Sequence, residues 1–110
     1  MSHLRRPDFG EEIAFCAFTF QAPDGSKQAV RLRIGKPYMI AETEWACPLE
    51  IHGFEPREVD IRGADALQAL GLTMSFARKR MEHFLTMGGR ILYPDGDPYT
   101  FESLQSLFGR

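Results

Sequence analysis

The stretch that most constrains the fold is residues 64–87, where apolar residues recur at alternating steps of three and four. This spacing places them on one face of an α-helix. Asp65, with Gln68 three residues later, resembles a capping box and predicts the helix start, whereas Gly88-Gly89 predicts the stop. Met74 lies midway along the stripe, so we expect it to be buried. The full stripe comprises Leu67, Leu70, Met74, Ala77, Met81 and Phe84.

The first half of this helix, up to Ala77, is apolar almost all round. A helix of that kind is buried on more than one side. Either the chain's own C-terminal segment, residues 101–108, or a second subunit can supply the additional cover. Small or neutral side chains on one helix face would let another backbone approach closely. The candidate interface residues are Gln68, Gly71, Leu72 and Ser75.

The segments that flank the helix read as strands, over residues 13–21, 29–35, 45–52, 58–62 and 90–93. The turn Pro23-Asp24-Gly25-Ser26 predicts that the first two strands form a hairpin. The first strand is apolar on both faces, which predicts a central strand that is covered on both sides. Pro48 lacks a backbone donor, so we expect the third strand to lie at an edge or to carry a bulge. Residues 36–43 read as a connection.

The length of 110 residues is typical of one domain, residues 1–110. Strands followed by a long helix and a small tail predict an α+β fold. In that fold an antiparallel sheet of four to five strands carries one long helix packed across one face and a short C-terminal helix, with Thr100 as its cap. The expected parts are a flexible arm (1–10), the strands (11–62), the long helix (64–87), and a short strand with the C-terminal helix (90–110).

Composition and charge argue against several classes of partner. The net charge of −2 is unlike that of a polyanion binder. Arg78, Lys79 and Arg80 are consecutive, so they point to different sides of the helix and form no single basic stripe. We therefore expect no nucleic-acid binding. No apolar run approaches the ~20 residues of a membrane span. The N-terminus lacks a signal-peptide apolar core, which predicts a cytoplasmic protein whose Cys16 and Cys47 are free, reduced thiols.

The sequence lacks the motifs that are typical of metal and cofactor chemistry. The three histidines have no ligand spacing, and the two cysteines lie far apart, so we expect no metal and no cofactor. Asp95-Gly96-Asp97 lacks the later ligands of a calcium loop and predicts a turn. The nucleophile elbow, the phosphate-binding loop and the dinucleotide fingerprint are all missing from the sequence. No catalytic residue is therefore predicted.

A set of short motifs carries a family resemblance. Trp45-Ala46-Cys47, then Gly63-x-Asp65-x-x-Gln68-Ala69-Leu70, then Gly88-Gly89-Arg90 resembles a family of small bacterial proteins catalogued only as a domain of unknown function. The resemblance spans roughly residues 30–93. It implies a bacterial cytosolic protein without an established activity, and it supplies no catalytic residues.

Two functions from different classes remain open. The first is a non-enzymatic protein-interaction module that binds a protein partner or forms a homodimer, which the apolar helix and first strand favour. The alternative is a small-ligand-binding protein or an enzyme with a pocket between sheet and helix. We favour the first because chemically reactive residues do not cluster in the sequence. The candidate pocket residues of the alternative are Trp45, Cys47, Glu50, His52, Gln68 and His83.

Overall fold

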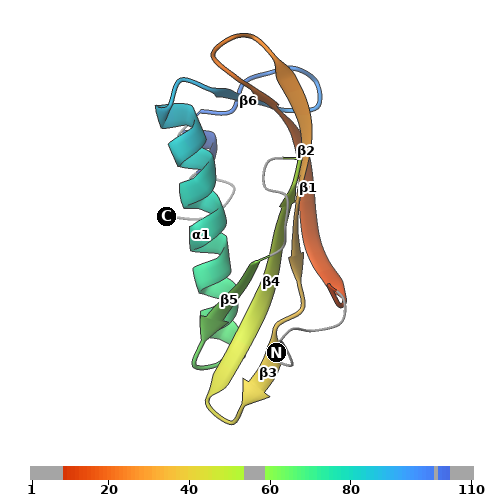
Figure 1. The fold of residues 1–110 in the computed structure, drawn as a ribbon, viewed down its shortest axis with the longest axis vertical. Coiled ribbons are helices and arrows are strands. Elements are labelled where there is room, and N and C mark those ends of the chain that lie inside the picture. Colours follow the sequence, from red (N-terminus) through yellow and green to blue (C-terminus); the bar gives the residue numbers. More distant parts are fainter. Residues whose placement is uncertain (1–8, 54–58, 101, 105–110) are drawn as a thin grey trace.

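The computed structural model describes residues 9–53, 59–100 and 102–104, and it has a mixed α+β architecture (Figure 1). A curled antiparallel sheet lies beside one long helix, and a short helical segment at residues 102–104 follows the last strand. The elements are β1 (Glu12–Gln21), β2 (Lys27–Gly35), β3 (Tyr38–Ala41), β4 (Glu44–His52), β5 (Val59–Gly63), α1 (Ala66–Thr86) and β6 (Arg90–Leu92).

The described part of the sheet has six strands, in the order β3-β4-β2-β1-β6, and β5 pairs with β4. The hairpin of β1 and β2 is confirmed, and Ala22 donates its backbone N–H to the carbonyl of Ser26 at 2.8 Å within the predicted turn. The predicted connection at residues 36–43 contains a further strand, β3, which pairs with the first part of β4. Its four residues are all apolar and do not alternate in polarity, and so short a run does not identify a strand by periodicity alone.

The strand that contains Pro48 is interior, so of the two expected alternatives the edge is wrong, and an irregularity in its pairing lies between Met39 and Ala41 of β3. β2 pairs with β4 as far as Leu49, β3 resumes the pairing at Ala46, and β5 pairs with the other side. Pro48 therefore faces the gap between β2 and β3, where its missing donor costs no ladder hydrogen bond. Gly35 allows this close approach, because a Cβ there would lie 2.9 Å from Pro48 Cγ.

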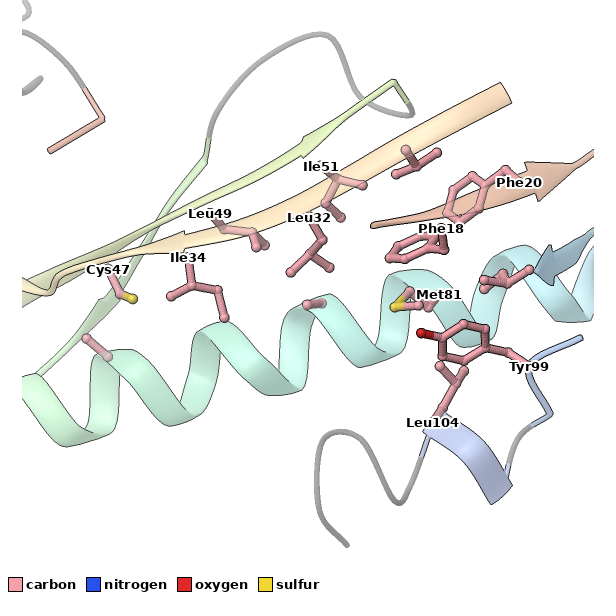
Figure 2. Close-up of a cluster of buried hydrophobic side chains, with 14 residues drawn as sticks. Phe18, Phe20, Leu32, Ile34, Cys47, Leu49, Ile51, Met81, Tyr99 and Leu104 are labelled. Carbon is pink, nitrogen blue, oxygen red and sulfur yellow. The ribbon is translucent and has the colours of Figure 1, made fainter. Parts of the chain in front are cut away.

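The core forms where one face of the sheet meets α1, and its side chains point toward the helix (Figure 2). Phe20 stacks on Phe84 of α1 with ring centroids 4.2 Å apart. The C-terminal segment adds Tyr99 and Leu104, which are both buried. Thr100 caps the short helix as predicted, since its Oγ1 accepts the backbone N–H of Ser103 at 3.0 Å.

The ends of α1 are those that the sequence predicts, within one or two residues. The carboxylate of Asp65 accepts the backbone N–H of Gln68 at 2.8 Å, and the Gln68 side chain accepts the backbone N–H of Ala64 in return. Gly88 follows the helix with a φ of 94°, a conformation that glycine adopts without steric cost. The two ends of α1 are therefore set by interactions between residues that are close in the sequence.

The buried face of α1 is rotated relative to the predicted stripe. Leu67 is 79% exposed, so its expected place on the buried face is wrong, whereas Met74 is partly buried and packs against the core. The cause is close packing at the helix start, because a Cβ on Gly63 would lie 2.6 Å from the backbone nitrogen of Ala69. The helix therefore approaches β5 through the small residues Gly63 and Ala69. The buried positions are Ala69, Thr73, Ala77 and Met81.

The first strand is covered on one face only, so the expectation of cover on both faces is wrong. Phe18 and Phe20 point into the core, whereas Phe15 is 58% exposed and Ala17 is also exposed. Phe15 and Ala17 lie on the outer face of the sheet, because side chains along a strand alternate between the two faces and Phe18 and Phe20 take the core face. Phe9, placed by the sequence in a flexible arm, is buried, and its ring lies 3.8 Å from the Arg33 guanidinium.

Some sequence predictions lie outside the described residues. They concern residues 1–8 of the expected arm, Glu58 at the start of the fourth predicted strand, and Phe101, Leu107 and Phe108 of the C-terminal helix. Within the described part of that helix, Leu104 is fully buried.

Stability should fall at high pH because of Tyr99. Burial, with smaller contributions from Cys16 and Tyr93, raises the pKa of Tyr99 from 10.0 to about 12. The phenol of the unfolded chain ionises first, so its contribution to stability is complete below about pH 10 and is lost between about pH 10 and 12. We expect the urea midpoint to fall more steeply above about pH 10 for the wild type than for Tyr99→Phe. Parallel pH dependences would contradict the prediction.

Candidate functional site

The structure separates the predicted pocket residues of β4. Trp45 and Cys47 lie on the face of the sheet that meets α1, where Cys47 is buried and Trp45 is partly buried. Glu50 and His52 occupy the alternate positions of the strand and therefore lie on the outer face. Glu50 is held there by Arg33, whose Nε lies 3.3 Å from Glu50 Oε1. These four side chains do not face one site.

The two helical candidates lie near opposite ends of α1, and both are exposed. Gln68 is part of the N-terminal cap, as its side chain accepts the Ala64 N–H. His83 lies in the last turn, where its carbonyl accepts the backbone N–H of Met87 at 3.0 Å. The geometry thus brings neither residue to Cys47 or to His52.

Both cysteines are free thiols in the structure. Burial raises the pKa of Cys16, and burial is also the largest cause of the raised pKa of Cys47. The Cys47 Sγ donates to the carbonyl of Gly35 at 3.5 Å. A thiol whose pKa is raised stays protonated at neutral pH and is a weak nucleophile. Both environments therefore suit structural rather than reactive cysteines.

The outer face carries a chain of ion pairs across β1, β2 and β4. Arg31 makes a bidentate contact with Glu12 at 3.1 and 3.0 Å, and its guanidinium lies 4.3 Å from the ring centroid of Phe15. Arg33 Nε lies 3.5 Å from Glu12 and 3.3 Å from Glu50. Carboxylates of the chain already pair with both arginines. The cluster therefore helps to fix the register of the sheet rather than to bind an anionic ligand.

An exposed apolar surface lies on the first half of α1, and we call Leu67, Gln68, Gly71, Leu72 and Ser75 the α1 surface. Leu67 is 79% exposed and Leu72 is 46% exposed. A Cβ built on Gly71 meets nothing within 4 Å, so this part of the helix is open. The structure therefore leaves the predicted interface residues accessible, apart from partial burial of Ser75.

A second exposed apolar surface lies at the edge of β1, and we call residues 12–18 the β1 free edge. β6 pairs only with residues 19–21 of β1, so residues 12–18 have a strand partner on one side alone within the described part of the chain. Ile13 is 46% exposed and Phe15 is 58% exposed. No charged residue or proline interrupts residues 13–20. Charges, prolines and β-bulges are the usual protection of such an edge, and the pairing of β1 with β2 is irregular between Glu12 and Ala14.

The register shows which backbone groups of β1 face this edge. Ala22 donates to Ser26, which marks a hydrogen-bonded pair of the β1–β2 ladder. Hydrogen-bonded and non-hydrogen-bonded pairs alternate along an antiparallel ladder. The backbone N–H and C=O groups of Phe15 and Ala17 therefore point away from β2, toward the free edge. The sequence predicted that both faces of β1 are apolar. It did not predict that residues 12–18 lack a second strand partner within the described part of the chain.

The described residues contain neither a metal-binding cluster nor a membrane-spanning helix. No group of three or more His, Cys, Asp or Glu side chains is arranged there to hold a metal ion. None of the helices in that part combines the length and the apolar character that a bilayer crossing requires.

Comparison with protein families matches residues 11–102 to a model described as Domain of unknown function (DUF6968). The match covers every strand and the long helix, and it extends beyond the range of the sequence motifs. No curated protein and no solved structure matches the chain.

Proposed function

The chain belongs to the family described as domain of unknown function DUF6968, and from this premise we propose that it is a non-enzymatic protein-interaction module. The observation that carries the proposal is the position of the exposed large hydrophobic side chains. They are concentrated on the β1 free edge and the α1 surface, and contiguous exposed apolar surface usually marks an interaction site. Among the described residues these side chains are Ile13, Phe15, Met39, Leu67, Leu72 and Met87.

Two further observations support an interaction module over a ligand pocket. The residues that could line a pocket lie on both faces of the sheet and near both ends of α1. The most buried thiol, Cys47, has a raised pKa, which suppresses thiolate chemistry. The cytoplasmic location and the bacterial origin stay predictions from the sequence.

The partner that we propose is a second copy of the chain. Pairing about a two-fold axis is the commonest way in which a protein covers an exposed apolar surface of its own. Either surface could carry the contact. The α1 surface offers Leu67 and Leu72 around the open position of Gly71. The β1 free edge offers apolar side chains together with backbone groups that have no strand partner among the described residues.

Light scattering on the purified wild-type chain tests this proposal. We expect a mass of about twice the 12.5 kDa of one chain at high micromolar concentration. Dilution should return the mass of one chain, because self-association in reversible equilibrium depends on concentration. A wild type that keeps the mass of one chain throughout the series would contradict self-association.

A further inference from the structure

We infer that residues 9–12 form a latch, a segment that closes over the outer face of the sheet at Pro48 and opens as a unit while the core stays folded. Its sequence is Phe-Gly-Glu-Glu, so Phe9 is the one apolar side chain that can anchor it. The latch belongs to the single chain and does not depend on the proposed self-association.

The outer face of the sheet is buried at one place in β4. Ala46 and Pro48 take the outer-face positions of this strand, because Cys47 and Leu49 alternate with them and point into the core (Figure 2). Ala46 and Pro48 are nevertheless fully buried. The long helix covers the opposite face, so another part of the chain must cover Pro48.

Phe9 provides this cover. A Cβ on Gly35 would lie 2.9 Å from Phe9 Cε2 and 2.9 Å from Pro48 Cγ, so both rings pack against the bare backbone of Gly35. The guanidinium of Arg33 lies 3.8 Å from the centroid of the Phe9 ring, within the range of a cation–π contact. Phe9 is only 6% exposed as a result. We call Arg33, Gly35 and Pro48 the socket.

The rest of the latch is held by polar contacts. The carbonyl of Glu11 accepts the backbone N–H of Lys36 at 2.7 Å, one residue beyond the end of β2. Glu12 pairs with Arg31 at 3.0 Å and with Arg33 at 3.5 Å, and all three side chains are partly exposed. Ion pairs that water reaches contribute little to stability. The ring of Phe9 therefore contributes most to keeping the latch closed.

Two backbone features separate the latch from the regular sheet. Gly10 has a φ of 80°, a left-handed conformation that glycine adopts without steric cost, and it serves as the hinge beside the anchor. The pairing of β1 with β2 is irregular between Glu12 and Ala14, so the regular ladder begins only after the latch. A segment with few buried apolar contacts opens at a lower free-energy cost than the core. Opening would expose the socket to solvent.

Amide hydrogen exchange of the full chain, measured by NMR at low urea concentrations, tests the latch. The Lys36 amide reports on it, because its acceptor is Glu11. The Ala77 amide reports on the core, because Ala77 is fully buried within α1. We expect Lys36 to be protected at least about tenfold less than Ala77, with little dependence on urea, since local opening exposes little surface. Equal protection and equal urea dependence, or a Lys36 amide without protection, would overturn the inference.

Phe9→Ala should open the latch, and Phe15→Ala is its matched control. Both rings lie beside an arginine guanidinium, but Phe15 is 58% exposed and lies outside the socket. We expect Phe9→Ala to lower the protection of Lys36 by at least about tenfold, the effect of losing a buried ring, with the circular dichroism spectrum unchanged. Phe15→Ala should keep it within about threefold of the wild type. Unchanged Lys36 protection in Phe9→Ala would contradict the latch.

Gly35→Ala changes the socket and leaves Phe9 in place. The added methyl group would lie 2.9 Å from the Phe9 ring, so the ring must leave its position. We expect a loss of Lys36 protection comparable to that of Phe9→Ala. The double variant should lose less than the product of the two single losses, because both substitutions act on one contact. Losses that multiply fully would place the two effects at independent sites and would overturn the inference.

Discussion

Met81→Asp should unfold the protein, whereas Leu67→Asp should leave its stability almost unchanged. Met81 is fully buried within the core cluster, where the aspartate would replace apolar contacts and bring a charge without a partner. The combined cost exceeds about 4 kcal/mol, a large part of the 5–15 kcal/mol that holds a typical domain together. Leu67 is 79% exposed, so its aspartate stays in water.

The comparison is sharp because the sequence pattern treats these two residues as equivalent members of one stripe. Urea denaturation followed by circular dichroism measures both variants against the wild type. We expect Met81→Asp to lack a cooperative transition and Leu67→Asp to stay within about 0.5 kcal/mol of the wild type. Equal losses in the two variants would show that the helix is buried on the predicted stripe.

The second large effect is expected at Gly63, in the last position of β5. A Cβ there would lie 2.6 Å from the backbone nitrogen of Ala69 and 2.9 Å from its Cα. Neither atom can move without displacing the start of α1. We expect Gly63→Ala to lower the free energy of unfolding by about 1–3 kcal/mol, the cost typical of overpacking.

Gly71→Ala is the matched control for this substitution. Gly71 lies within α1, and a Cβ there meets nothing within 4 Å, so only helix propensity changes. Alanine is favoured over glycine by about 1 kcal/mol in a helix interior, so we expect a gain of that order. The two substitutions add the same methyl group and should change the urea midpoint in opposite directions. A gain in both would show that β5 and α1 are not in close contact at Gly63.

Part of the candidate site could be predicted from single residues, and part could not. The candidate interface positions on α1 were found because Gly71 and Leu72 lie in an unusually apolar helix, and both are exposed in the structure. The pocket candidates were chosen by chemical type, and strand alternation placed Glu50 on the face opposite Cys47. The β1 free edge was missed, because the lack of a neighbouring strand is a property of the whole sheet.

The sequence by itself determined the features that depend on neighbours along the chain. Asp65 and Gly88 set the ends of α1, and the turn at Pro23 closed the β1–β2 hairpin, because caps and turns are hydrogen-bonded within a few residues. Only the tertiary structure decided the rotation of α1, the interior position of β4 and the exposure of β1. The rotation follows from the close approach of Gly63 to Ala69, and the open edge of β1 among the described residues follows from the short length of β6. These are contacts between distant segments, which local periodicity does not encode.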